Sequence, residues 1–191
     1  MLSKMQDFDR LKLKVDLDGT SLCDFAHKLD EIIANNPDKS ILVIMNTIPS
    51  SVSVFNEVKV VEEEKFYVST AVLPLERQKR IRDISERLKM RKRTILISTQ
   101  VVGAGVHFDF DIVVRDLSPI GSIVQATGRC NCNGERPTNN TPVYVFAVYD
   151  EEGKYFANKI YGNSLIEKTR ETLLSLIGQR FIPHRFNCPS T

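Results

Sequence analysis

The sequence predicts an α/β domain built on a mainly parallel sheet with helices on both faces. Short, wholly apolar runs such as ILVIM at residues 41–45 are typical of strands buried on both faces of a parallel sheet. Segments with helical apolar spacing alternate with these runs along the chain. The length of 191 residues is close to that of one domain. Strands alternating with helices within one domain favour parallel strands joined by crossover helices.

The first half of the chain carries three predicted strands and two predicted helices. Residues 10–17 (RLKLKVDL) alternate as a strand with one exposed face, and Asp18-Gly19 predicts a turn after it. Thr20 or Ser21 is expected to cap a helix over residues 22–34. After the strand at 41–45, Pro49 fits the first turn of a helix that runs to about residue 60. Residues 66–69 form another short strand.

The second half continues the alternation. Pro74 opens a predicted helix to about residue 90, whose inner face is expected to carry Leu75, Ile81, Ile84 and Leu88. Further strands are expected at residues 94–97, 112–114 and 142–148, and further helices at residues 118–127, 155–161 and 164–176. We expect one domain over residues 1–178 and a loose tail over residues 179–191, which contains two prolines.

Composition excludes several classes of protein. Hydrophobic residues make up 42% and charged residues 26%, so the chain is not disordered or collagen-like. It has neither an apolar run long enough to span a membrane nor a secretory signal, so we expect a cytoplasmic protein with no membrane partner. Cys130 and Cys132 form CxC without a second ligand pair, which favours free thiols over a zinc site.

Residues 76–93 are strongly basic, with nine Lys or Arg against three acids. One interpretation is a solvated helix face. The other is contact with the phosphates of single-stranded DNA, which would be independent of sequence and sensitive to salt. Few aromatic residues lie among these charges, so base stacking is not expected.

Three polar segments follow predicted strands, where open α/β sheets bind ligands. They are Asn46-Thr47, residues 98–106 (STQVVGAGV) and residues 118–136 (SPIGSIVQATGRCNCNGER). Each also has a purely structural interpretation: a helix cap at Asn46-Thr47, a tight turn at Gly103 and Gly105, and a cation at a helix C-terminus for Arg129. The sequence contains neither a GxxxxGK[ST] phosphate loop nor a GxGxxG fingerprint.

Taken together, the order and spacing of these segments resemble the second RecA-like domain of superfamily 2 helicases. The closer resemblance is to the C-terminal helicase domain of the CRISPR-associated nuclease-helicase of type I systems. ILVIMNT resembles helicase motif IV, and STAVLPLERQKRIRDI resembles the segment that follows it. ILISTQVVGAGVHFDFDIVVRDLSPIGSIVQATGRCNCNGE resembles motifs V and VI, and YGNSLIEKTRETL resembles the next helix. The similarity covers residues 41–174.

The resemblance implies a RecA-like three-layer domain that forms one wall of a cleft for ATP and Mg²⁺. The first RecA-like domain would supply the phosphate loop and the metal ligands, and an arginine of the second would stabilise the transferred phosphoryl group. Other implied partners are single-stranded DNA and the CRISPR effector complex. The implied catalytic residues are Arg129 and Gln125; the implied nucleotide-binding residues are Gly105, Val106, His107, Gly128 and Arg136; the implied nucleic-acid-binding residues are Asn46, Thr47, Thr70, Arg77, Arg80, Thr99 and Gln100.

The sequence departs from the family pattern in motifs V and VI. Gly103 and His107 replace two acids, and Ala126 and Cys132 replace two arginines, although Arg136 follows nearby. His107 is either a ribose contact or an ordinary loop histidine. These departures leave three functions open: the second half of an ATP-dependent DNA translocase, a binding or inhibitory partner of the CRISPR machinery, and a related helicase acting on RNA. In each case the isolated chain is expected not to hydrolyse ATP.

Overall fold

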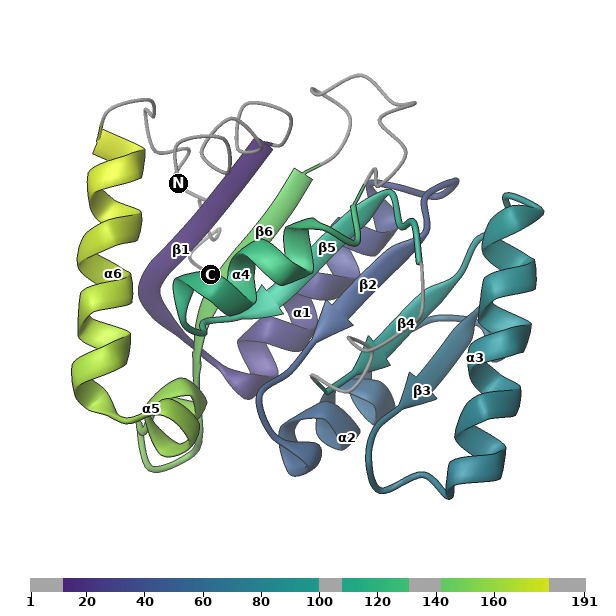
Figure 1. Cartoon of the computed structure of the whole chain (residues 1–191), viewed down its shortest axis with the longest axis horizontal. Coiled ribbons are helices and arrows are strands. Elements are labelled where there is room, and N and C mark those ends of the chain that lie inside the picture. Colours follow the sequence, from purple (N-terminus) through teal and green to yellow (C-terminus); the bar gives the residue numbers. More distant parts are fainter. Residues whose placement is uncertain (1–11, 100–107, 131–141, 179–191) are drawn as a thin grey trace, which may run out of the picture.

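The computed structural model describes residues 12–99, 108–130 and 142–178, and these residues build one layered α/β unit (Figure 1). Its elements alternate as the sequence predicts. In chain order they are β1 (Lys12–Ser21), α1 (Leu22–Ala34), β2 (Ile41–Ile44), α2 (Ile48–Glu57), β3 (Lys65–Val68), α3 (Pro74–Lys89), β4 (Ile95–Ser98), β5 (Ile112–Asp116), α4 (Ile120–Thr127), β6 (Pro142–Tyr149), α5 (Phe156–Tyr161) and α6 (Asn163–Gly178).

The described strands form a six-stranded sheet in the order β1-β6-β5-β2-β4-β3. Every pairing in it is parallel, which confirms the predicted parallel sheet. β2 lies between β4 and β5, so that Ile44 pairs with Ser98 on one side and with Arg115 on the other. The carboxyl ends of β2, β3, β4 and β5 therefore meet at one edge of the sheet.

Helices cover both faces of the sheet, which confirms the predicted layers (Figure 1). On one face, α1 and α2 pack through Phe25, Leu29 and Val54 against Val43 and Val114 of the central strands. On the other face lie α3, α4 and α6, whose core side chains are Ile84, Ala126, Ile123, Ile166 and Leu173. The strands that carry apolar residues on both faces are thus buried from both sides.

The Asp18-Gly19 turn was predicted wrongly. β1 continues through these residues to Ser21, and its register against β6 shifts between Asp16 and Thr20. Gly19 has φ +97°, and a Cβ placed there would lie 2.8 Å from the Tyr155 hydroxyl. The turn-forming pair therefore makes a bulge within a longer strand, because pairing with β6 resumes beyond it. The predicted cap is confirmed at Ser21, whose hydroxyl accepts from the Asp24 amide.

Two other boundary predictions need correction. Leu75 was expected on the inner face of α3, but its side chain is 81% exposed. The helix instead faces the sheet with Ile81, Ile84 and Leu88, a spacing of three and four residues that Leu75 does not share. α2 ends at Glu57 rather than near residue 60, because Val58 adopts an extended conformation. The remaining helices and strands lie within a few residues of their predicted positions.

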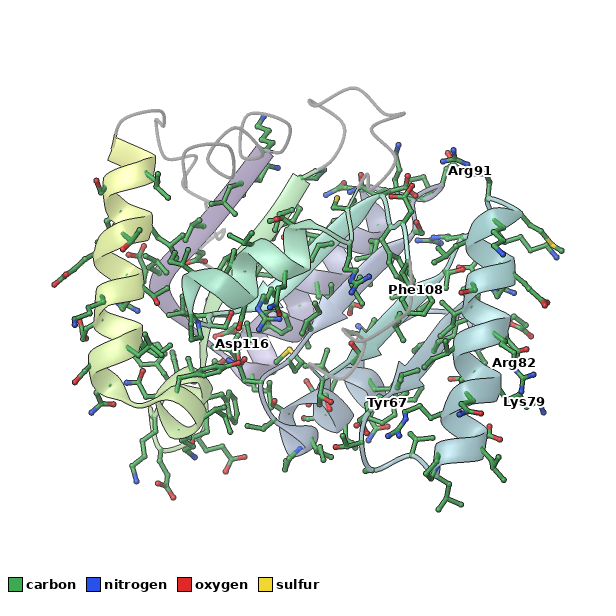
Figure 2. The ribbon with its side chains drawn as sticks, viewed as in Figure 1. Tyr67, Lys79, Arg82, Arg91, Phe108 and Asp116 are labelled. Atoms are coloured by element: carbon green, nitrogen blue, oxygen red, sulfur yellow. The ribbon has the colours of Figure 1, made fainter. Side chains whose placement is uncertain are left out.

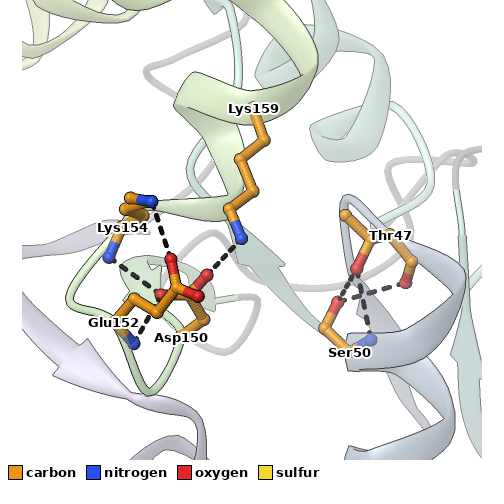
Figure 3. A network of polar contacts seen from close by, with 6 residues as sticks. All are labelled: Thr47, Ser50, Asp150, Glu152, Lys154 and Lys159. Atoms are coloured by element: carbon orange, nitrogen blue, oxygen red, sulfur yellow. Dashed lines mark hydrogen bonds and ion pairs between the residues drawn. The ribbon is translucent and has the colours of Figure 1, made fainter.

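The connection from β6 to α5 is fixed by a polar network around Asp150 (Figure 3). Its carboxylate accepts from the backbone amides of Glu152 and Lys154 and is paired with the Lys159 ammonium of α5. The hydrogen bond from Lys159 lowers the pKa of Asp150, with help from the Lys154 amide. This turn sets where α5 begins, and α5 brings Tyr161 back over the sheet.

Candidate functional site

Polar residues gather at the carboxyl edge of the sheet. Asn46 and Thr47 follow β2, Thr70 follows β3, and Thr99 follows β4. Thr70 is exposed, whereas Thr99 is buried. These four residues belong to the predicted nucleic-acid set, and the strand order places their segments side by side. Gln100, predicted for the same set, lies outside the described residues.

Thr47 caps α2. Its hydroxyl accepts from the Ser50 amide at 3.2 Å and shares a 2.7 Å hydrogen bond with the Ser50 hydroxyl (Figure 3). The structural interpretation of this residue as a helix cap is therefore correct. Its side chain is only partly buried, so the cap leaves part of it at the surface of the edge.

Asn46 points into the domain. Its side-chain nitrogen donates to Asp116 Oδ2 at 2.7 Å and to the backbone oxygen of Leu117 at 2.6 Å. A side-chain amide has two hydrogens, and both are used in these contacts. The side chain is also almost fully buried, with the residue 8% exposed. Donation from this amide to a DNA phosphate would require one of these two contacts to break.

The end of β5 carries two buried charged residues that sequence reasoning missed, Arg115 and Asp116 (Figure 2). Asp116 Oδ1 accepts from the Val148 amide of β6 at 3.3 Å, while Oδ2 faces Asn46. Arg115 donates through Nε to the Ser118 hydroxyl at 2.5 Å. In the sequence, the one indication of this pair is that two charged residues directly follow the apolar run IVV. The same pattern is also typical of an exposed strand end.

Burial dominates the electrostatics of this cluster. It raises the pKa of Asp116 to about 8, against the lowering effects of the Val148 amide, Arg115 and Asn46. Burial also lowers the pKa of Arg115, opposed by the nearby Tyr161 and Asp116. Burial likewise raises the pKa of Tyr161, although Arg115 acts against it. The cluster joins β2, β5, β6 and α5 through polar groups that are held away from water.

The described residues of the segment that resembles motif VI run toward the opposite edge of the sheet. α4 begins near the carboxyl end of β5 and runs back along it, so that its last residues reach the amino end of β5 (Figure 1). There the Phe110 amide donates to the Arg129 backbone oxygen at 2.9 Å, and Gly128 ends the helix. Gln125 is exposed on α4. Eight helical residues span about 12 Å at about 1.5 Å each, so Gly128 and Arg129 lie about that far along the helix from its start near the carboxyl end of β5.

This separation corrects the expectation that all three polar segments lie at the carboxyl ends of strands. The start of the third segment does lie there, but the helix carries the chain as far as Cys130 to the other edge. The predicted nucleotide residues Gly105, Val106, His107 and Arg136 lie outside the described residues, as do the substituted positions Gly103 and Cys132.

Ala126, one of the departures from the family pattern, is buried. It is 3% exposed and belongs to a cluster with Phe108, Phe110 and Cys130, in which Phe108 and Phe110 pack edge to face. An arginine at this position would have to enter or displace apolar packing. Within the described ranges, no group of three His, Cys, Asp or Glu side chains is placed to hold a metal ion.

The basic side chains of helix α3 fall into two groups, those that contact the rest of the domain and those that face outward. Arg80 donates to the backbone oxygen of Tyr67 at 3.0 Å and pairs with Glu76. Arg87 donates to the backbone oxygen of Arg93 at 2.9 Å and lies 5.1 Å from the ring centroid of Phe66. These two arginines therefore support the fold around β3 and β4. The side chains of Lys79 and Arg82 are exposed on the outer side of the helix (Figure 2), and Arg77 is partly buried.

A cavity of about 380 Å³ lies elsewhere, between α1 and the pair β1–β6. Its lining includes Lys14, Lys28 and Tyr144, but none of the predicted site residues. The Lys14 ammonium donates to the Tyr144 hydroxyl at 2.9 Å, and Lys28 pairs with Asp16. These contacts satisfy the two lysines within the fold. In the part of the chain that the structure describes, none of the helices is both long and apolar enough to cross a membrane.

Comparison with known proteins identifies the family. The sequence profile of the C-terminal part of the CRISPR-associated nuclease/helicase Cas3 matches residues 37–135. A curated relative, the CRISPR-associated nuclease/helicase Cas3 of Methanothermobacter thermautotrophicus, is 24% identical over 152 residues, which is 80% of this chain and 18% of the relative. The chain thus spans about a fifth of the length of the relative it matches.

Solved structures show the same fold. The crystal structure of T. fusca Cas3 has a TM-score of 0.73 at 15% identity, over 88% of this chain and 22% of that one. The crystal structure of T. fusca Cas3-ATP has a TM-score of 0.71 at 17% identity, again over 88% of this chain and 22% of that one. A chain from a CRISPR RNA-guided surveillance complex, pre-nicking, gives 0.65 at 18% identity, over 92% and 24%.

S. cerevisiae Dbp5 bound to RNA and ADP BeF3 gives a TM-score of 0.58 at 17% identity, over 90% of this chain and 45% of that one. The predicted RecA-like fold is therefore confirmed, in an α/β domain whose six described strands are all parallel. The profile match covers the segments that resemble motifs IV, V and VI, whereas the segment at residues 161–173, on which the resemblance also rested, lies beyond it. The chain belongs to the family of the C-terminal helicase region of the CRISPR-associated nuclease/helicase Cas3.

Proposed function

We propose that this chain is the second RecA-like half of an ATP-dependent translocase that moves along single-stranded DNA in CRISPR interference. The observation that carries the proposal is the position of α4. The helix has Gln125 and Arg129 toward one edge of the sheet, while the polar ends of β2, β3 and β4 lie at the other edge. In this proposal, one domain would present separate surfaces for a nucleotide and for a nucleic acid, which a motor must couple.

The nucleotide surface is one wall of a cleft in this proposal. Arg129 would stabilise charge on the transferred phosphoryl group, and Gln125 would orient the reacting phosphate or water. Gly105, Val106, His107, Gly128 and Arg136 would complete the wall. The first RecA-like domain would supply the phosphate loop and the Mg²⁺ ligands, which neutralise charge on the phosphate oxygens when the ion is bound. The crystal structure of T. fusca Cas3-ATP supports ATP as the nucleotide.

The carboxyl edge is the proposed DNA surface. Thr47 and Thr70 would offer small polar groups for backbone phosphates, together with Gln100, and Arg77 would add a charge at the start of α3. Thr99 is buried, so its hydroxyl would reach a phosphate only after the residues over it move. Such contacts carry no sequence information, so binding would be independent of base sequence. Arg80 donates to the neighbouring Tyr67 carbonyl, and the Asn46 side chain is buried beneath this edge, where it donates to Asp116. The CRISPR effector complex is the proposed partner of the complete enzyme, in line with the related chain in a surveillance complex.

Reconstitution tests this function. The isolated chain should not hydrolyse ATP, whereas addition of the first RecA-like domain, in trans or by fusion, should produce DNA-stimulated ATPase. Arg129→Ala should then lower turnover by roughly 10³-fold or more, as for other transition-state arginines. Lys168→Ala is the matched control, because it removes an exposed cation from α6 on a different part of the domain. Equal turnover for Arg129→Ala and Lys168→Ala would refute the assignment.

A second function is favoured by one observation, the buried Ala126 at a position where the family has arginine. A domain that has lost this arginine is suited to act as a binding or inhibitory partner of the CRISPR machinery. In that case the reconstituted pair would show no ATPase, and excess isolated chain would inhibit a working interference reaction. ATPase in the reconstituted pair, with no inhibition by the isolated chain, would exclude this second function.

A further inference from the structure

The start of α4 is held by contacts from three strands. Asn46 after β2 donates to the Leu117 backbone oxygen at 2.6 Å, and the Leu117 amide donates to Phe146 of β6 at 2.8 Å. Arg115 of β5 donates to the Ser118 hydroxyl. The helix has no side-chain cap of its own, since Pro119 stands at the N-cap. Its first turn therefore depends on Leu117 and Ser118 being fixed by their neighbours.

The end of α4 is also held by contacts, which it makes with the segment before β5. The Phe110 amide donates to the Arg129 backbone oxygen at 2.9 Å, and the Cys130 thiol contacts the Asp111 backbone oxygen at 3.5 Å. Between these ends, Ile123 is fully buried and Ala126 almost so. A short helix anchored in this way transmits a shift at its first turn to its last, because packed interiors are not freely deformable. The position of the Arg129 backbone therefore depends on the position of Leu117.

Asn46 connects this start to the carboxyl edge of the sheet. Its two amide hydrogens are divided between Asp116 Oδ2 and the Leu117 oxygen, and Tyr161 of α5 lies 3.5 Å from its Oδ1. No amide hydrogen is left for a ligand. The residue directly after Asn46 is Thr47, which caps α2 at the proposed DNA surface. Asn46 therefore stands between that surface and the start of α4.

We propose that Asn46 is a positioning residue, which fixes the start of α4 through Asp116 and Leu117 and thereby sets the place of Arg129. The consequence for catalysis rests on the proposed function, whereas the positioning itself does not. This assignment replaces a direct side-chain contact between Asn46 and DNA. It also gives a role to the buried pair Arg115 and Asp116. Asp116 accepts from Asn46, and Arg115 donates to Ser118 in the loop between β5 and α4.

Hydrogen exchange on the whole chain, without nucleotide or DNA, tests the positioning. Asn46→Ala removes both donors, and Asn46→Asp keeps the shape but presents only acceptors. In both variants the amides of Leu117, Ile123 and Phe110 should exchange about tenfold faster, as expected when buried hydrogen-bond partners are lost. Ile33→Val, in α1 on the other face of the sheet, is the control for general loss of stability. In this control, the exchange rates of these three amides should keep their ratio to the rates of the other core amides. Should Asn46→Ala fail to fold, Asn46→Ser retains one donor and should give a smaller acceleration at the same amides.

Two further measurements separate this proposal from its alternatives. Asn46→Ala should leave the affinity of the isolated chain for an oligothymidylate unchanged. If the variant instead bound the oligothymidylate more weakly while hydrogen exchange stayed as in the wild type, Asn46 would be a DNA contact and the proposal would be overturned. Unchanged exchange and unchanged binding would overturn it as well. In the pair reconstituted with the first RecA-like domain, Asn46→Ala should lower kcat while the KM for ATP stays the same. If the wild-type pair lacks ATPase, the proposed function fails, and the exchange result still decides the positioning.

Discussion

The buried carboxyl group of Asp116 makes a specific prediction about pH and stability. Asp116 is 0% exposed, and burial raises its pKa from 3.8 to about 8. Between these two pH values the folded chain binds a proton that the unfolded chain has released. Stability contributed by this group therefore falls as pH rises. The slope is at most about 1.4 kcal/mol per pH unit, so that the loss between about pH 5 and pH 7 is about 3 kcal/mol.

Asp116→Asn provides the measurement, because asparagine resembles the protonated carboxyl group and does not titrate. Urea unfolding of both proteins at a series of pH values gives the difference in free energy of unfolding, in which the other titrating groups cancel. Relative to the variant, the wild-type chain should lose stability steadily from about pH 5 to about pH 8 and should level off above that value. A difference that is flat over this range would refute the reasoning. It would show that Arg115 and the hydrogen bonds from Asn46 and Val148 keep Asp116 ionised in the folded chain.

Two other predictions follow from the edge strand and from the basic helix. Gly19→Ala should lower the free energy of unfolding by about 1–3 kcal/mol, because Gly19 has a positive φ and a Cβ there would meet the Tyr155 hydroxyl. The loss should exceed that of Gly153→Ala, where φ is +74° and the space is open. Equal losses of unfolding free energy in urea would show that the Tyr155 side chain moves aside at little cost. Single-stranded DNA binding by the chain should weaken with salt, with a log–log slope of about −2 for about three phosphates. Replacing Arg77, Lys79 and Arg82 by Gln should flatten that slope in a fluorescence-anisotropy titration, and an unchanged slope would return α3 to the interpretation as a solvated face.

The sequence by itself determined the order and type of the elements. Apolar runs such as 41–45, and helical spacing such as that of Ile81, Ile84 and Leu88, depend on neighbours in the chain, so they can be read without knowing the fold. The same holds for the cap at Ser21, whose partner Asp24 is three residues away. The family resemblance also rested on local motifs, and the profile match over residues 37–135 covers most of those segments.

Only the tertiary structure decided how the side chains of the candidate site are used. Asn46 finds its partners 70 and 71 residues away, and it does so because β2 and β5 are neighbours in a strand order that periodicity does not encode. Arg80 is directed to a carbonyl of β3 by the packing of α3. Arg129 is carried to the amino edge of the sheet by the direction of α4. The physical reason is the same in each case: a polar side chain that leaves water must take whichever partner the packed fold brings within hydrogen-bond distance, and that partner is set by strand order and helix direction rather than by neighbours in the sequence.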